Sequence, residues 1–306
     1  MRKLALLMIL VATPVSAKVV NVEFKFTPFV GDPAKADMVT TVEGQARVLL
    51  NGVPVVEQEV GSQQVPVLFD EREVAPAVWV PVDSIGPVLR KGRNTIRFEF
   101  EPKDAKAAYR AQLRWASVND ETTTTGDAAA GTATNQSGEG VDSRQATGKV
   151  AFDHDFVADF AVDRPWHHYP AVTALSDDDR KILTVMLESR LQAFKPDFAA
   201  LYALLKSNPH VDVAAIRSAR CVDKAYAAGV RMNVAPADQV EFVTTGGPAV
   251  VVRARSRELY RPEKPSSFEK IKGDEAQMCA GMALISAFPP RLVAVHAPSG
   301  AWELVP

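Results

Sequence analysis

The sequence predicts a chain of two parts: an N-terminal antiparallel β-sandwich, followed by an α+β domain of helices packed on an antiparallel sheet. Three observations lead to this prediction. Short runs with apolar and polar residues in alternation recur from residue 19 to residue 118, as in sandwich strands. Helical spacing begins only after residue 176, and strand periodicity returns after residue 240. The predicted bounds are 18–165 for the sandwich and 166–306 for the α+β domain.

Residues 1–17 have the pattern of a signal peptide. Two basic residues precede an apolar run over 4–11, and the small residues at 15–17 stand where a signal peptidase cuts. We therefore expect cleavage before Lys18 and a periplasmic or secreted mature protein. The alternative is an N-terminal membrane anchor, but the run is short for a bilayer and no later stretch has a spanning length. No membrane span is predicted in the mature chain.

Charge and cysteine content narrow the classes of partner. Removing Arg2 and Lys3 with the leader changes the formal charge from −2 to −4, and no basic stripe exists. Nucleic acid is therefore not an expected partner. Cys221 and Cys279 are the only cysteines, and an even count in an exported protein predicts one disulfide, which would join the helical layer to the late sheet. The alternative is two buried free thiols. A metal site is not expected, because two cysteines alone do not complete its set of ligands.

The strands of the first half can be placed in order. Apolar residues alternate with polar ones over 20–26, and again over 46–50 towards Asn51-Gly52, a strong hairpin signal. The pattern resumes at 53–56. Further strands are predicted at 65–69, 77–81, 95–100 and 109–115.

Residues 49–56, 80–89 and 91–97 resemble the jelly-roll, galactose-binding-like modules attached to many glycosidases. In those modules a strand carries an Asn-Gly turn, and a later segment reads Leu, two residues of any kind, Gly, any residue, Asn and then alternating apolar residues. The resemblance covers about fifty residues and implies a jelly-roll sandwich, without carrying over any sugar-binding residue. Trp79 and Trp115 are binding candidates because indoles stack on sugar rings. Core or half-buried positions are the alternative.

A segment from Lys149 to Pro170 separates the two halves. It begins as a strand with one apolar and one acidic face, and it ends at Pro165, which cannot continue a central strand. The low-complexity run before it, 119–148, is interpreted as a flexible hairpin loop that joins paired strands at 111–118 and 150–160. The alternative is an interdomain linker.

This segment also holds the remaining site candidates. Asp153, Asp155 and Asp159 could offer oxygen ligands to calcium, the one cofactor that the sequence suggests. Side chains two apart on a strand are about 7 Å apart, so other segments would have to complete the shell. A solvated acidic face is the alternative. His167, His168 and Tyr169 are binding candidates, and either histidine could bind metal or act as a base. Packing between the domains is the alternative.

The second half begins with helices. Ser176 and three following aspartates form an N-terminal cap for a helix that reaches about Phe194. A second helix starts at Pro196, and a third runs from Asp212 to Ala228. Strands are predicted at 240–245, 249–260, 268–271, 278–288, 292–296 and 301–305, with a helix as the alternative for the segment that begins at 278.

No motif of nucleophilic or zinc-dependent catalysis occurs: Gly-x-Ser-x-Gly, His-Glu-x-x-His and a phosphate loop are all absent from the sequence. The predicted function is therefore that of an exported, non-catalytic binding or assembly protein with a protein or carbohydrate ligand. The alternative is a hydrolase or metal-dependent enzyme with its site at the domain junction, near residues 153–169. A polar junction pocket with clustered His and Asp would favour the enzyme, and an apolar or aromatic surface would favour binding.

Overall fold

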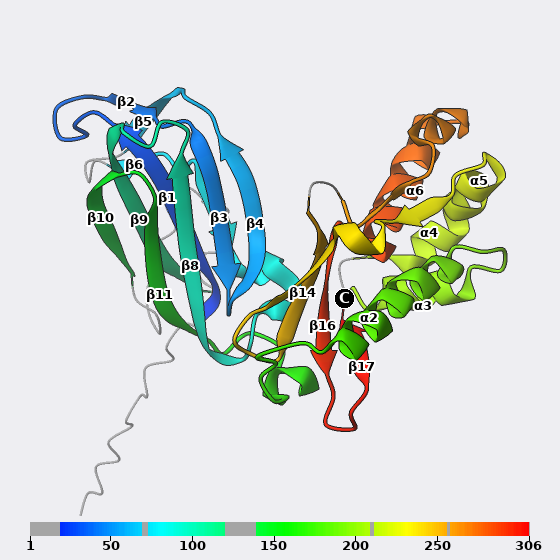
Figure 1. Cartoon of the computed structure of the whole chain (residues 1–306). Coiled ribbons are helices and arrows are strands. Elements are labelled where there is room, and N and C mark those ends of the chain that lie inside the picture. The colour runs from blue at the N-terminus through cyan, green and yellow to red at the C-terminus, as the bar shows by residue number, and fades with distance from the viewer. Residues whose placement is uncertain (1–18, 69–72, 120–138, 209–210, 256–257, 306) are drawn as a thin grey trace, which may run out of the picture.

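A computed structural model describes residues 19–68, 73–119, 139–208, 211–255 and 258–305. The predicted signal peptide and most of the low-complexity run lie outside these residues. Figure 1 shows two sheets of the first half on one side of the molecule, and a third sheet with the helices on the other.

The first half contains two antiparallel sheets. The larger has the order β10-β9-β1-β2-β5-β6, with β7 also paired to β1, and the smaller has the order β11-β8-β3-β4. The strands of the larger sheet are β1 (Val19–Val30), β2 (Met38–Thr41), β5 (Gln64–Leu68), β6 (Glu73–Val74), β7 (Val78–Pro81), β9 (Ala108–Asn119) and β10 (Glu139–Thr147). Those of the smaller are β3 (Gly44–Leu50), β4 (Val53–Val60), β8 (Gly92–Pro102) and β11 (Val150–Ala158), and the 3-10 segment η1 (Val82–Val88) follows β7.

An aromatic core lies between these sheets. Phe24 and Phe26 on β1 contact Phe98 on β8, with ring centres 6.0 and 5.8 Å apart. Phe152 and Phe156 on β11 meet the same two β1 rings edge-on. The period-two pattern of β1, β8 and β11 therefore places their apolar faces inward, as predicted.

The predicted hairpin loop over 119–148 is wrong for its C-terminal part. Residues 139–147 form β10, which pairs with β9 from Glu139↔Ala116 to Thr147↔Ala108. β10 is mostly exposed and polar on both faces, so it carries no apolar periodicity, and its backbone hydrogen bonds to β9 hold it instead. The predicted pairing of 150–160 with 111–118 is also wrong. After a turn at Gly148 (φ 73°), β11 enters the other sheet and pairs with β8.

The second half contains an antiparallel sheet and helices, in agreement with the predicted class. The sheet order is β13-β14-β16-β17, and a separate pair joins β12 to β15. The strands are β12 (Met232–Val234), β13 (Val240–Thr244), β14 (Ala249–Ala254), β15 (Tyr260–Pro262), β16 (Arg291–His296) and β17 (Trp302–Val305). The helices are α2 (Asp177–Arg190), α3 (Ala199–Lys206), α4 (Val213–Ala219), α5 (Cys221–Ala227) and α6 (Asp274–Ala287), with 3-10 segments η2 (Pro165–His168), η3 (Leu191–Ala193), η4 (Ala237–Gln239) and η5 (Pro265–Lys270).

Three predictions about the second half need correction. Residues 278–288 lie mainly in helix α6, and 268–271 lie at a 3-10 segment. The α6 sequence lacks the amphipathic periodicity of a surface helix, because both of its faces are apolar: Ala280 and Leu284 are buried, whereas Met282 and Ile285 are exposed. The predicted third helix is divided into α4 and α5 at Arg220, whose φ is 51°.

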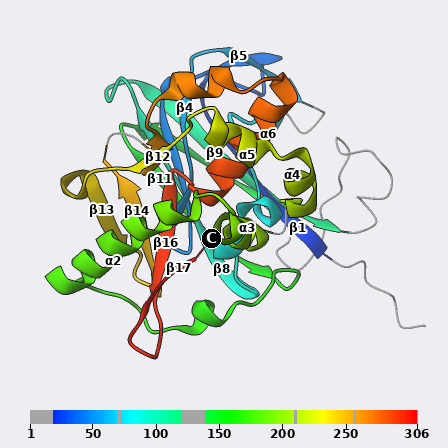
Figure 2. The ribbon, with the colours of Figure 1, turned by 90° about the vertical axis from the view of Figure 1, so that its right-hand side faces the viewer.

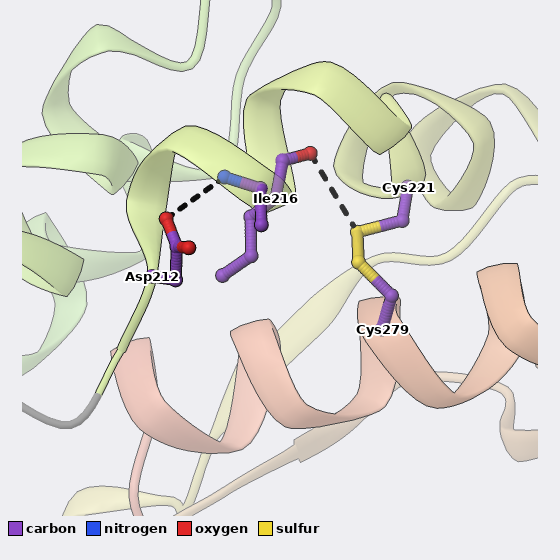
Figure 3. Close-up of a disulfide and its surroundings, with 5 residues drawn as sticks. Asp212, Ile216, Cys221 and Cys279 are labelled. Atoms are coloured by element: carbon purple, nitrogen blue, oxygen red, sulfur yellow. Dashed lines mark hydrogen bonds between the residues drawn. A yellow bond between two sulfur atoms is a disulfide. The ribbon is translucent and has the colours of Figure 1, made fainter.

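The predicted disulfide between Cys221 and Cys279 is confirmed (Figure 3), and its Cα atoms are 5.9 Å apart. It connects α5 to α6. Because α6 is a helix, the bond joins two helices and does not join the helical layer to a strand, as the sequence had suggested. Asp212 caps the neighbouring α4 by accepting a hydrogen bond from the Ala215 amide.

The sheet of the second half contributes to two cores. Val250 and Val252 of β14 belong to the helical core, whereas Val251 of the same strand and Val295 of β16 belong to the core of the first half. Successive side chains on a strand point to opposite faces, so this sheet is buried on both sides. Figure 2 shows the helices in front of this sheet. The two halves therefore form a continuous packed body along β14 and β16.

Candidate functional site at the junction of the two halves

A groove with a volume of about 370 Å³ lies where the two halves meet. Its walls come from residues 53–56 of β4, 79–81 of β7, Ile85, Pro87 and Val88 of η1, Val251 of β14 and residues 289–293 at the start of β16. Valine and proline dominate this lining, and Arg291 is its only charged member among the described residues. The sequence did not predict this groove, because its walls come from four stretches that are far apart along the chain: 53–56, 79–88, residue 251 and 289–293.

Trp79 lies at the edge of this junction groove and is 57% exposed. Its indole Nε1 donates a hydrogen bond of 3.3 Å to Glu23 Oε2, which restricts the orientation of the ring. Among the described strands, β7 pairs only with β1 and β4 only with β3, so the groove lies between two sheet edges. An exposed, oriented tryptophan beside apolar walls is typical of a binding surface.

The one charged group of the groove is already paired. Arg291 donates from Nη2 to the Val55 carbonyl at 2.8 Å, and its Nη1 lies 3.6 Å from Glu57 Oε2. Glu57 also accepts from Arg253 at 3.3 Å. Burial lowers the pKa of Arg291. These contacts connect β4 to the second half and leave Arg291 with a structural role.

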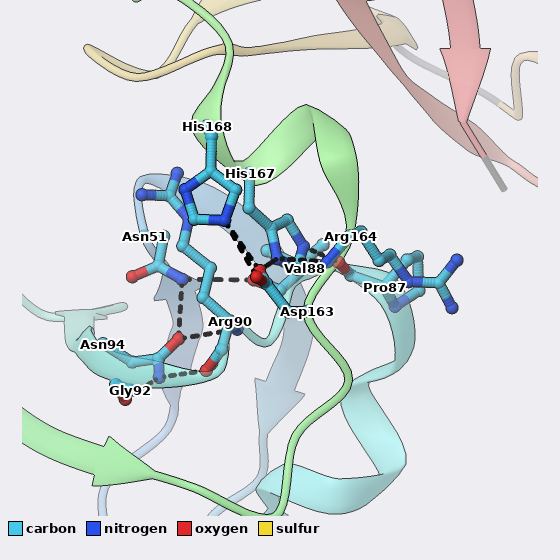
Figure 4. Close-up of polar contacts among 10 residues, drawn as sticks. All are labelled: Asn51, Pro87, Val88, Arg90, Gly92, Asn94, Asp163, Arg164, His167 and His168. Atoms are coloured by element: carbon cyan, nitrogen blue, oxygen red, sulfur yellow. Dashed lines mark hydrogen bonds and ion pairs between the residues drawn. The ribbon is translucent and has the colours of Figure 1, made fainter.

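His167 is buried beside the junction, and both of its ring nitrogens are hydrogen bonded (Figure 4). Nδ1 accepts from the Arg164 amide at 3.3 Å, so the proton is on Nε2, which donates to the Pro87 carbonyl at 2.8 Å. Burial lowers the pKa of His167. The predicted packing alternative therefore describes this residue better than a role as base or metal ligand.

His168, in contrast, is exposed and paired with an acid. Its Nε2 lies 2.9 and 3.0 Å from the two carboxylate oxygens of Asp163, and this bond lowers the pKa of Asp163. An aspartate and the histidine that it orients are two of the three residues of a nucleophilic triad. In the described part of the chain, however, no serine, threonine or cysteine side chain is hydrogen bonded to it. Tyr169 packs, half-buried, against the core of the first half.

The three aspartates of the predicted calcium site do not converge. Asp153 accepts two hydrogen bonds from Arg97, at 2.8 and 3.0 Å. Asp155 accepts from Thr95 at 2.6 Å and from Arg93 at 2.7 Å, and these bonds lower its pKa. Asp159 lies beyond the end of β11. No group of three or more His, Cys, Asp or Glu residues suited to a metal occurs within the described ranges.

Trp115 points into the first half, unlike Trp79. It is half-buried, and its ring centre lies 4.1 Å from that of His154 on the facing sheet. His154 also meets Phe24 at 5.6 Å, and its Nε2 is buried without a partner among the described residues. Burial lowers the pKa of His154. Trp115 thus belongs to the core and is not placed to stack on a surface ligand.

Arg90, which sequence reasoning did not single out, is positioned by two asparagines (Figure 4). Its amide donates to Asn94 Oδ1 at 2.9 Å, and its carbonyl accepts from Asn94 Nδ2 at 2.8 Å. Asn51 donates to the same Asn94 oxygen at 2.9 Å. Asn94 is 1% exposed, so this segment is firmly held. Asn51 and Asn94 belong to the turn and strand patterns seen in the sequence, but the contact between them could not be predicted from those patterns.

The chain matches no family model, no curated protein and no solved structure.

Proposed function

We propose that this protein is an exported, non-catalytic binding protein, and that the junction groove binds an extended apolar segment of a partner protein. The observation that carries the proposal is the groove itself: apolar walls from both halves, two sheet edges, and Trp79 exposed beside them. Grooves of this type commonly bind peptides through apolar anchors, with main-chain hydrogen bonds at a free strand edge.

The polar groups near the junction support binding over catalysis. His167 is buried with both ring nitrogens bonded, and no serine, threonine or cysteine side chain of the described residues is hydrogen bonded to the Asp163–His168 pair. A hydrolase or metal-dependent enzyme at residues 153–169 would need such a nucleophile, or a ligand cluster that the described residues do not form.

The lining favours a protein segment over a carbohydrate. A sugar site needs several hydrogen-bonding side chains next to its aromatic ring, whereas the one charged side chain of this groove is bonded to Val55 and Glu57. One edge of β4 and one of β7 are not paired with another described strand. Main-chain pairing at these edges is limited, because Pro54 of β4 and Pro81 of β7 both lack a donor and the Val55 carbonyl already accepts from Arg291.

The proposal includes a periplasmic or secreted location, a jelly-roll, galactose-binding-like sandwich at 18–165 and an α+β domain at 166–306. The disulfide is the main support for export, because such bonds persist in oxidising compartments. Among the described helices, none is both long enough and apolar enough to cross a membrane.

The test is a selection of random 12-residue peptides on the mature protein, followed by affinity measurement through fluorescence anisotropy. Trp79→Ala should weaken the selected peptides at least about tenfold, because tryptophan is among the side chains that carry most of the binding energy at protein interfaces. Met38→Ala, which also shortens an exposed apolar side chain but lies outside the groove, should leave affinity unchanged. A parallel glycan array provides the second arm.

Peptides that bind Trp79→Ala as tightly as the native protein would disprove the groove as their site. Glycans that bind in a Trp79-dependent manner, without any peptide ligand, would replace the protein partner by a carbohydrate. His168→Ala should leave peptide affinity unchanged. A histidine-dependent hydrolytic activity would favour the enzyme instead.

A further inference from the structure

Arg90 is a half-buried cation without a protein counter-ion. Its Nε–H is buried with no acceptor, and neither terminal nitrogen makes a hydrogen bond or an ion pair with a described residue. Burial lowers its pKa. Burying part of a guanidinium without a partner costs free energy, so an unpaired arginine in such a place requires an explanation.

The surroundings fix where this guanidinium lies. Asn94 holds the Arg90 backbone through two hydrogen bonds, and the side chain crosses to the β13–β14 turn of the second half. There, a Cβ atom at Gly247 would lie 3.3 Å from Nη2, which is tighter than usual for such a contact. The turn thus passes close to Nη2, and Gly247 places no side chain against it.

No carboxylate of the described residues pairs with the Arg90 guanidinium. The Asp163 carboxylate is bonded to His168, and the charge of Arg90 contributes to the lowered pKa of His167. Figure 4 shows the Arg164 guanidinium pointing away from that of Arg90. A group with a single negative charge would balance the Arg90 guanidinium.

We infer that Arg90 forms a binding site for a single carboxylate group, in which the two ligand oxygens accept from the two terminal nitrogens of the guanidinium. Arginine has the planar, two-donor geometry that matches a carboxylate. The site is a separate one from the junction groove, and its existence does not depend on what the groove binds. The carboxylate can come from a small organic acid or from the C-terminus of a peptide.

Nuclear magnetic resonance of the arginine Nε–H groups tests this site in the mature protein. Acetate is titrated at constant ionic strength against chloride. We expect the Arg90 signal, assigned by its loss in Arg90→Gln, to shift saturably with acetate and not with chloride. Binding measured through the neighbouring amide signals should be at least tenfold weaker in Arg90→Gln and intermediate in Arg90→Lys, which keeps the charge but loses the two-donor geometry.

Lys91→Gln is the matched control, because it removes the same charge one residue away at an exposed position. It should bind acetate like the native protein. An equal loss of acetate affinity in Arg90→Gln and Lys91→Gln would mean general electrostatic attraction and would overturn the proposal. A titration that does not saturate would overturn it as well. Unchanged amide spectra away from the junction would show that Arg90→Gln is folded. If Arg90→Gln does not fold, acetate binding is compared between Arg90→Lys and the native protein instead.

Two further ligands identify the kind of anion and its source. Inorganic phosphate that binds tenfold more tightly than acetate would overturn the choice of a carboxylate. N-acetylalanine and its amide differ only in the carboxylate, so equal binding of the two would also overturn it. Tighter binding of N-acetylalanine than of acetate would support a peptide C-terminus, and equal binding of these two acids would support a small organic acid.

Discussion

Cys221, the first residue of α5, is bonded to Cys279 in the second turn of α6, and it is itself fully buried in the helical core. The bond spans 58 residues of sequence and joins two helices that also pack on each other. It therefore fixes the position of α6, whose sequence alone gives it no polar outer face.

Replacing both cysteines with serine should destabilise the second half. For a loop of this length the chain-entropy model gives about 4 kcal/mol, of which roughly 2–4 kcal/mol is typically realised. Urea unfolding with and without reductant measures the change. The native protein should lose stability in reductant, and the double variant should not respond. An equal response of both proteins would show that the reductant acts elsewhere.

His154 should make the first half sensitive to mild acid. The unfolded chain takes up a proton near pH 6.5, whereas burial lowers the pKa of the folded residue. The stabilising contribution of neutral His154 is therefore complete above pH 6.5 and decreases as the pH falls from there towards the folded pKa. His154→Phe should reduce the loss of melting temperature between pH 7.5 and pH 5.

The pKa of His167 is lowered for the same reason, so part of the acid sensitivity should remain in His154→Phe. Met38→Ala, at an exposed position without a titratable group, provides the control and should keep the native pH profile. A His154→Phe variant with the full native loss of melting temperature would contradict the assignment.

Asn94→Ala should be among the most destabilising single changes in the first half. The side chain is 1% exposed and makes four hydrogen bonds, which involve Asn51, Arg90 and Gly92. Removing it leaves buried groups without partners, each at a cost of about 1–3 kcal/mol. Asn233→Ala, at an exposed site on β12, should change the unfolding free energy by less than about 0.5 kcal/mol. Similar effects of the two changes would contradict this view of the network.

Gly140→Ala tests the contact between β10 and the core. A Cβ atom at Gly140 would lie 2.5 Å from Trp115 Cζ2, so a methyl group would displace the indole from its position near His154. We expect a loss of about 1–3 kcal/mol in chemical denaturation, as for an overpacked site. At Gly61 a Cβ would meet nothing within 4 Å, and Gly61→Ala should be nearly neutral. An unchanged unfolding free energy in Gly140→Ala would mean that Trp115 moves without cost.

Local features were readable from the sequence because they depend on neighbouring residues. The Asn51-Gly52 turn is present, with φ of 51° and 81°, between paired strands β3 and β4. Ser176 caps α2 and accepts a hydrogen bond from the Asp179 amide, as its position before the aspartates predicted. In both places side-chain chemistry within a few residues selects one backbone conformation.

The sequence by itself thus determined the strands with one apolar face, the capped helix and the cysteine pair. Only the tertiary structure decided the partner of β11, the strand character of β10 and the helical state of α6. β10 is held by backbone hydrogen bonds that leave no side-chain pattern, and α6 has two apolar faces that hide its period. The groove beside Trp79 and the unpaired Arg90 depend on contacts between distant segments, which local spacing cannot encode.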